Sequence, residues 1–238
     1  MPVQHSKASL HAFYADALRS GRSTGEKLRA PASPRFLALL ASLPAATPRH
    51  ALDLGYGAGA YTFALAEAGF TVVAVDQAPA EPLLRRLSQR EDVAERVTVV
   101  ESLLEQYPVE EDFGVLVAKD VLHYLSQHDA EALLTQAVRA SRSPSLHYLE
   151  VFTAISRTDP QGVQIHIEDE ARYTPESFTD ALEQIYAGWD VSLTWNDHTE
   201  QDTRSRRTYF EATRATVIAV RRHPAPAVAA AMQGREAS

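Results

Sequence analysis

Short apolar runs that alternate with helical stretches predict an α/β fold, in which a doubly wound, mostly parallel sheet carries helices on both faces. Such runs are typical of parallel strands, because these strands are covered on both sides. Five of them span residues 51–54, 71–75, 97–100, 114–118 and 146–152. Two further strand-like segments close the chain, so we expect a seven-stranded sheet, five strands from the runs and two from the end.

Residues 1–47 are helical in pattern, with apolar groups at Leu10, Phe13, Tyr14 and Leu18 and again over residues 36–43. We expect two helices here, separated by a polar loop over residues 20–26. This region is predicted to form an N-terminal helical lid beside the main domain.

The gaps between the runs hold predicted helices over residues 61–68, 80–89 and 130–140. Ser126 and Asp129 form an S-x-x-D start for the last of these. A polar insertion, residues 153–174, follows the fifth run and leads into a helix that begins at Pro175 behind the N-cap Thr174.

Residues 190–198 and 208–222 predict an antiparallel hairpin at the edge of the sheet. The main domain is therefore expected to span residues 48–222. The alanine- and proline-rich residues 223–238 are predicted to be a disordered tail.

Composition excludes several classes of function. The 238 residues include no cysteine, which removes disulfides, thiolate metal sites and cysteine nucleophiles. A net charge of −8 disfavours nucleic acids and anionic lipid as partners. No run approaches the roughly 18 apolar residues of a membrane span, and no signal peptide is visible at the start. We expect a cytoplasmic protein that acts on a small molecule.

Three of the ten glycines lie in one turn, at positions 55, 57 and 59, directly after the first strand and before a helix. Such a turn presents backbone N–H groups and the positive end of a helix dipole to a ligand. Asp76 ends the second strand, 21 positions after Gly55, which suits a carboxylate that binds ribose hydroxyls. A tight connection without a ligand is the simpler alternative for a lone glycine turn, and Asp76 argues against it.

The neighbouring residues complete a predicted nucleoside site. We assign Tyr56 and Gln77 to the cofactor as well, and the segment Glu101, Ser102 and Leu103 to its base. The spacing of Gly55, Gly57 and Ala60 also permits NAD. However, no tyrosine is followed four places later by lysine, and Asp53 stands where a pyrophosphate would be repelled. A zwitterionic or cationic ligand suits the site better.

The run from Ala51 to Gly59, with Asp76 and the segment from Phe113 to Leu125, resembles the class I S-adenosylmethionine-dependent methyltransferases, a Rossmann-like family. The part after Leu182 is similar to the small tellurite-resistance-type branch. The resemblance implies S-adenosyl-L-methionine as cofactor, with the three glycines against its methionine part and Asp76 on its ribose. It also implies that Asp53 interacts with the amino group and that residues 101–103 contact adenine. Tyr56 departs from the small residue usual in the family.

Lys119, Asp120 and His123 follow the fourth strand, which borders the cofactor in this fold. We assign Lys119 to cofactor binding and Asp120 and His123 to catalysis, with His123 as the first choice for a general base. Packing at a helix start is the alternative for His123. A base is needed only where the acceptor must lose a proton.

Substrate contacts are assigned to residues on elements that are free to form a lid: Tyr14, Arg172, Tyr173 and Trp195. His166 and Glu168 share a strand face, but without a second pair of ligands we expect a solvated loop and no metal. The sequence therefore predicts a methyltransferase for a small molecule, acting by in-line displacement. An NAD(P)-dependent oxidoreductase and a non-catalytic nucleoside-binding protein are the alternatives. The acceptor and the oligomeric state are open.

Overall fold

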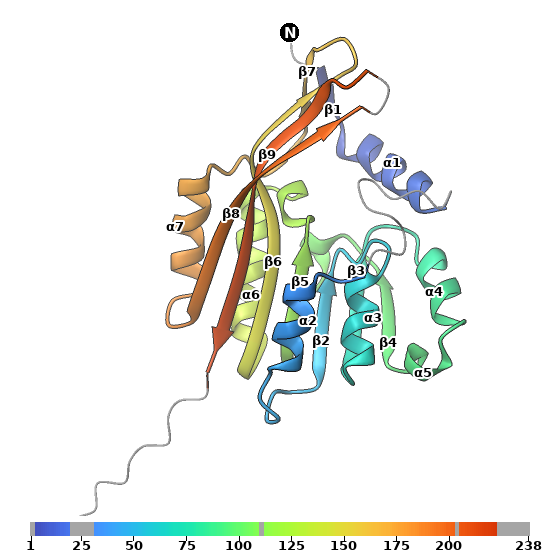
Figure 1. Ribbon diagram of the computed structural model, residues 1–238, viewed down its shortest axis with the longest axis vertical. Helices are drawn as coiled ribbons and strands as arrows, with labels where there is room; N and C mark the ends of the chain where they lie inside the picture. Colours follow the sequence, from blue (N-terminus) through green and yellow to red (C-terminus); the bar gives the residue numbers. More distant parts are fainter. Residues whose placement is uncertain (1–2, 20–30, 110–111, 203–204, 223–238) are drawn as a thin grey trace, which may run out of the picture.

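The computed structural model describes residues 3–19, 31–109, 112–202 and 205–222. One sheet joins all nine strands of these residues. Its main body runs in the order β4-β3-β2-β5-β6-β9-β8. The first five strands in this order are parallel, and β9 and β8 are added to β6 in antiparallel fashion. The predicted doubly wound sheet with a terminal hairpin is confirmed (Figure 1).

The strands are β1 (Val3–His5), β2 (His50–Leu54), β3 (Thr71–Asp76), β4 (Val97–Glu101), β5 (Phe113–Lys119), β6 (Ser141–Thr158), β7 (Gln164–Ile167), β8 (Asp190–Gln201) and β9 (Thr208–Arg221). The helices are α1 (Lys7–Arg19), α2 (Pro34–Ala41), α3 (Ala60–Glu67), α4 (Glu81–Leu87), α5 (Glu91–Ala94), α6 (Gln127–Ala140) and α7 (Pro175–Ile185). Two 3-10 turns, η1 (Leu104–Gln106) and η2 (Leu122–Tyr124), follow the ends of β4 and β5.

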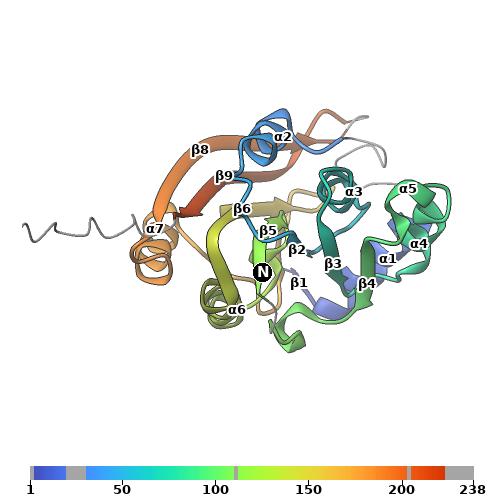
Figure 2. The same cartoon turned by 90° about the horizontal axis from the view of Figure 1, so that it is seen from below.

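Helices cover both faces of the sheet (Figure 2). Helices α2 and α3 lie on one face, where Phe36 and Leu65 join the buried strand residues Val72 and Val117. Helices α6 and α7 pack on the other face in a second apolar cluster. Both faces of the central strands are therefore dry, which explains their continuous apolar runs.

Helix starts follow the predicted caps. The Ser126 hydroxyl accepts a hydrogen bond from the Asp129 N–H, at 3.1 Å, and Thr174 forms a reciprocal capping box with Ser177. Ser33 caps α2 by accepting from the Phe36 N–H at 3.2 Å. No described helix combines the length and apolar character of a membrane span.

The largest difference from the predicted elements is the length of β6, which continues to Thr158 instead of ending at Phe152. Its extension pairs with β9 and with β7, and β7 pairs with β1 in turn. The segment of His166 predicted to be a solvated loop is thus a strand in part. Strands β6, β8 and β9 form an arm with β1 and β7 that rises beyond the central sheet (Figure 1).

The N-terminal prediction of two helices matches α1 and α2, but the short strand β1 precedes them. The predicted loop over residues 20–26 and the predicted tail over 223–238 lie outside the described residues. Whether residues 1–47 act as a lid stays a prediction.

Candidate functional site

The glycine turn connects β2 to α3 at the carboxyl edge of the parallel strands. Gly55 has φ of +73° and donates its N–H to the Val75 carbonyl at 2.7 Å. A Cβ on Gly55 would lie 2.6 Å from Val121, so this glycine is required for close packing as well as for its conformation. Gly59, with φ of +82°, would meet Leu83 at 2.5 Å.

Gly57 differs from Gly55 and Gly59, because a Cβ placed on it would meet no atom of the described residues closer than 4.0 Å. Its φ is +50°, which glycine adopts readily. The space in front of Gly57 is open, and an added methyl group would project into it. This opening at the turn fits a ligand that approaches the backbone closely.

Asp76, at the end of β3, fastens this turn. Its two carboxylate oxygens accept hydrogen bonds from the N–H groups of Gly57 and Ala78, each at 2.9 Å. Tyr56 is buried and donates its hydroxyl to the Ala78 carbonyl at 3.2 Å, so its phenol braces the turn. Burial, with Asp76 and Glu101 nearby, raises the pKa of Tyr56, which keeps the phenol neutral.

Asp53 lies beneath the turn and is almost completely buried. Its carboxylate accepts a hydrogen bond from the Thr62 hydroxyl of α3, at 2.5 Å. Burial raises the pKa of Asp53 to about 7, against the hydrogen bond from Thr62, and the nearby Asp76 raises it further. Asp53 therefore faces α3 in the described structure, and its predicted contact with an amino group stays a prediction.

Glu101 lies next to Asp76 across the β3–β4 pairing and accepts from the Ala80 N–H at 2.5 Å. Ser102 donates its N–H to the Asp76 carbonyl at 2.9 Å. Gln77 is exposed, and Leu103 is half-buried. The structure thus brings the predicted ribose and base residues together along one edge, at the ends of β3 and β4.

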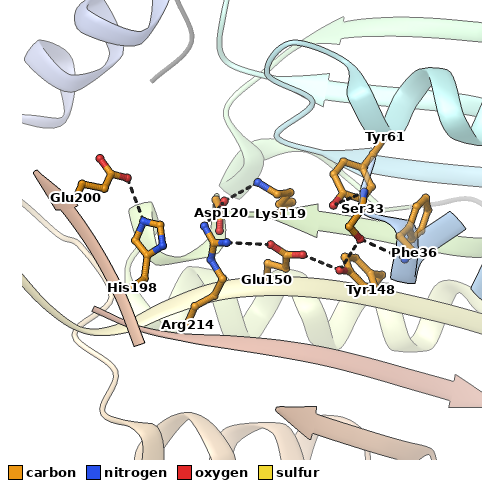
Figure 3. A network of polar contacts seen from close by, with 10 residues as sticks. All are labelled: Ser33, Phe36, Tyr61, Lys119, Asp120, Tyr148, Glu150, His198, Glu200 and Arg214. Atoms are coloured by element: carbon orange, nitrogen blue, oxygen red, sulfur yellow. Dashed lines mark hydrogen bonds and ion pairs between the residues drawn. The ribbon is translucent and has the colours of Figure 1, made fainter. Parts of the chain in front are cut away.

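A second group of polar side chains lies at the end of β5. Lys119 and Asp120 form an ion pair, with 2.7 Å between Nζ and Oδ2, and the same Oδ2 lies 3.1 Å from a guanidinium nitrogen of Arg214 on β9 (Figure 3). Asp120 has φ of +52°, a conformation that aspartate tolerates better than most residues, and its N–H donates to the Glu150 carbonyl at 2.8 Å.

The same chain of contacts continues into β6 and α2. Arg214 lies 3.7 Å from the buried Glu150, which accepts from the Tyr148 hydroxyl at 2.6 Å. Tyr148 in turn lies 3.1 Å from the Ser33 hydroxyl that caps α2. Sequence reasoning missed Arg214, Glu150 and Tyr148. A visible signal was the acidic Glu150 inside the otherwise apolar run from Leu146 to Phe152.

His123 is fully buried beside the rings of Tyr124 and Phe152, at centroid distances of 4.1 and 5.1 Å. Neither of its ring nitrogens has a hydrogen-bond partner. Burial, helped by the charges of Arg157 and Arg214, lowers the pKa of His123 well below its usual range. A neutral imidazole without access to solvent is a weak base, so these features favour packing over proton transfer.

The predicted substrate residues are not brought together. Tyr173 is buried between α6 and α7, where its ring lies 5.0 Å from Phe178. Trp195 lies 6.4 Å from the same ring, on the α7 side of β8. Arg172 is exposed, and the side chain of Tyr14 on α1 lies outside the described part of the structure. Their roles stay predictions.

Metal-binding geometry is not found among the described residues, where no cluster of three histidine or acidic side chains lies close enough to hold an ion. His166 is half-buried on β7, and Glu168 is exposed just beyond it.

Comparison with known proteins identifies the central part of the chain. Residues 51–143, which hold the glycine turn, Asp76 and the end of β5, match a methyltransferase domain family. This part of the chain is a methyltransferase domain. The sequence-based identification as a class I S-adenosylmethionine-dependent methyltransferase is confirmed by this match and by the fold. No curated protein sequence matches the chain.

Solved structures share the fold at low sequence identity. The 1,6-didemethyltoxoflavin-N1-methyltransferase of Burkholderia thailandensis, solved with its substrate and S-adenosylhomocysteine, has a TM-score of 0.58 and 19% identity over 88% of this chain and 87% of its own. TehB of Haemophilus influenzae has a TM-score of 0.58 and 14% identity, over 82% of this chain and 65% of its own. The [4+2]-cyclase SpnF has a TM-score of 0.57 and 13% identity, over 94% of this chain and 99% of its own.

The matched residues thus contain the turn with Asp76 and, of the second polar group, Lys119 and Asp120, whereas Glu150 and Arg214 lie outside them. The arm lies outside the matched residues, since β1 precedes residue 51 and the other arm strands, all but the start of β6, follow residue 143. The cyclase shows that a shared fold alone does not determine the reaction.

Proposed function

We propose that this protein transfers the methyl group of S-adenosylmethionine to a small-molecule acceptor by in-line displacement. The observation that carries the proposal is the open space in front of Gly57, bordered by the Asp76 carboxylate, inside a methyltransferase domain. The structural neighbour that binds didemethyltoxoflavin and S-adenosylhomocysteine supports a small acceptor.

The residues of the turn suit the parts of this cofactor. Gly57 lets the cofactor lie against the backbone, and the Asp76 carboxylate at the end of β3 is a suitable acceptor for the two ribose hydroxyls. Glu101 to Leu103, at the end of β4, lie where an adenine attached to that ribose would extend. The acidic side chains Asp53, Asp76 and Glu101 also give the edge a negative potential, which favours a cofactor with a sulfonium charge.

Lys119 and Asp120 extend this edge toward the acceptor. Their side chains are 17% and 23% exposed, so they are shielded from water but reachable. We place Asp120 against the nucleophilic atom of the acceptor, because its Oδ1 is buried without a hydrogen-bond partner. A carboxylate with an unused lone pair can accept a hydrogen bond from a hydroxyl or an amine.

The cofactor supplies a methyl group bound to a positively charged sulfur. As a lone pair of the acceptor forms the bond to this carbon, the carbon–sulfur bond breaks and its electrons stay on sulfur. A hydroxyl or amine acceptor also releases a proton, which passes to the Asp120 carboxylate and then to water. The chain contributes mainly alignment and exclusion of water, and alignment alone supplies about 7–11 kcal/mol of barrier reduction in favourable cases.

The experiment is a calorimetric titration of the full chain with S-adenosylmethionine, S-adenosylhomocysteine and NADH. We expect both sulfur compounds to bind and NADH not to bind. Methyl transfer from radiolabelled S-adenosylmethionine to a panel of phenols, amines and carboxylic acids then tests turnover. Tight NADH binding without binding of the sulfur compounds would contradict the proposal. Binding without turnover on the panel would favour the non-catalytic alternative.

A further inference from the structure

The inner face of the arm places the side chains of Phe152, Arg214 and His198 just beyond the end of β5. The last pair between β5 and β6 is Lys119 with Glu150, whereas the pairing of β6 with β9 begins at Ser145 and continues beyond it to Arg157. Phe152 lies opposite Arg214 of β9, and Arg214 lies opposite Asn196 of β8. Because side chains two residues apart on a strand share a face, His198 follows Asn196 on this face. Figure 3 shows His198 beside Arg214 and Asp120.

Phe152 lies beneath this surface, since it is only 6% exposed and is covered by His198 and Arg214. Its ring centroid lies 4.8 Å from that of His198, and the Arg214 guanidinium lies 4.6 Å from it. The side chains of His198 and Arg214 are 27% and 24% exposed, so the surface is recessed but open to solvent. Flat groups of this kind present a large contact area to a planar ring and prefer offset or edge-to-face packing.

The charges around this surface leave no net positive charge, and Glu200, 3.1 Å from His198, adds a further carboxylate. Lys119 and Arg214 carry two positive charges, and Asp120 and Glu150 carry two negative ones. Each cation contacts at least one of these carboxylates, at 2.7 Å for Lys119 and at 3.1 and 3.7 Å for Arg214. An anionic acceptor would have to compete with carboxylates for both cations. A neutral acceptor would leave these contacts in place.

One hydrogen-bond acceptor remains unused in this group. Oδ1 of Asp120 is buried and has no partner in the described part of the chain, although Oδ2 of the same carboxylate is shared by Lys119 and Arg214. A buried carboxylate oxygen without a donor is costly, which makes it a site where a ligand donor gains free energy. Nε of Arg214 is likewise buried without a partner among the described residues, so a ligand group that can both donate and accept, such as a hydroxyl, would satisfy both atoms.

From these observations we propose that the methyl acceptor is a neutral, planar ring compound with a hydroxyl or N–H donor. The donor would lie on Asp120, and the ring would pack over His198 and the Arg214 guanidinium, which cover Phe152. This inference rests on the proposed function, since it names the substrate class of the same site.

The test uses the full chain saturated with S-adenosylhomocysteine and two matched probes, phenol and benzoate. Saturation-transfer NMR and calorimetry give their affinities. We expect phenol to bind with a dissociation constant of about 1 mM or lower, an energy of about −4 kcal/mol. Benzoate should bind at least tenfold more weakly.

Two variants locate the probe. Asp120→Asn keeps the shape of the side chain and suits the positive φ, and it should weaken phenol at least fivefold. Phe152→Leu should weaken it by a similar factor without removing the carboxylate. Asp112→Asn is the matched control, because Asp112 is exposed at the opposite end of β5 and contacts only Arg142 by ion pairing among the described residues.

The outcomes separate this inference from the proposed function. If S-adenosylhomocysteine does not bind, the proposed function fails first. If S-adenosylhomocysteine binds but benzoate binds more tightly than phenol, only the acceptor class is overturned. The same holds if phenol shows no binding at a concentration 20-fold above the expected dissociation constant of about 1 mM. Equal phenol affinity in the Asp120→Asn and Asp112→Asn proteins, both folded by circular dichroism, would also overturn it.

Discussion

The two halves of the candidate site hold their carboxylates in different ways. In the cofactor half, at the ends of β2 to β4, Asp53 is held by a hydroxyl, and Asp76 and Glu101 by backbone N–H groups. In the acceptor half, at the ends of β5 and β6, Asp120 and Glu150 are held by Lys119 and Arg214. Neutral donors leave the first half negative, whereas cations neutralise the second. The first suits a positively charged cofactor, and the second a neutral acceptor.

The cofactor half should therefore respond most strongly to pH. The pKa of Asp53 is about 7 in the folded protein and near 3.8 in the unfolded chain. In the folded state Asp53 therefore stays protonated to a higher pH than in the unfolded chain. This group adds stability below about pH 4, and that stability is lost as pH rises through about 7. The contribution of Asp53 to the free energy of unfolding falls by about 4 kcal/mol over this range. Chemical denaturation of wild type and Asp53→Asn across this range measures it. The variant should gain stability relative to wild type as pH rises, and a constant difference between the two would contradict the assignment.

The next largest effect should come from Gly57→Ala. The new methyl group would enter the open space that we assign to the cofactor, so the dissociation constant of S-adenosylhomocysteine should rise at least tenfold, about 1.4 kcal/mol. The positive φ should also cost about 1–2 kcal/mol of stability.

Gly69→Ala is the matched control, since Gly69 has φ of +86° with nothing within 4 Å of an added Cβ. It lies between α3 and β3, at the opposite end of the sheet. It should lose similar stability and bind the ligand normally. Calorimetry and denaturation of both proteins check the pair, and equal affinity in the two would show that the space at Gly57 is not used.

In the acceptor half, substitutions in the chain of polar contacts from Ser33 to Arg214 should lower the free energy of unfolding by a smaller amount. Tyr148→Phe removes the donor to the buried Glu150 and should cost about 1–3 kcal/mol of unfolding free energy. Tyr61→Phe, which removes the contacts of the Tyr61 hydroxyl with Ser33, 3.4 Å for the one with its N–H, should cost less than about 1 kcal/mol. Urea denaturation compares the two. The reverse order would mean that the chain from Ser33 to Arg214 does not support this half.

The same comparison explains what the sequence could predict. The glycine turn, Asp76 and residues 101–103 follow consecutive strands, and the rule that parallel strands end at one edge brings them together. Local patterns therefore predicted the cofactor half and the central sheet. Phe152 and Arg214 meet only through the pairing of β6 with β9, and Arg214 and Asp120 lie 94 positions apart. No local pattern reports that register.

Two further differences have the same cause. The extension of β6 beyond Phe152 contains polar residues, and only pairing with β9 and β7 makes it a strand. His123 was a plausible base because of its position after β5, but the sequence does not show that Phe152 and Tyr124 enclose it. The acidic Glu150 within an apolar strand was the one local sign of the acceptor half.

The most direct test of the division between the halves is the affinity of S-adenosylhomocysteine for Asp76→Ala and Asp120→Asn, measured by calorimetry beside wild type. We expect Asp76→Ala to weaken binding by about 10- to 100-fold, because hydrogen bonds to a charged group contribute about 1.5–3 kcal/mol. Asp120→Asn should stay within threefold of wild type. Unchanged affinity in folded Asp76→Ala protein would contradict the account.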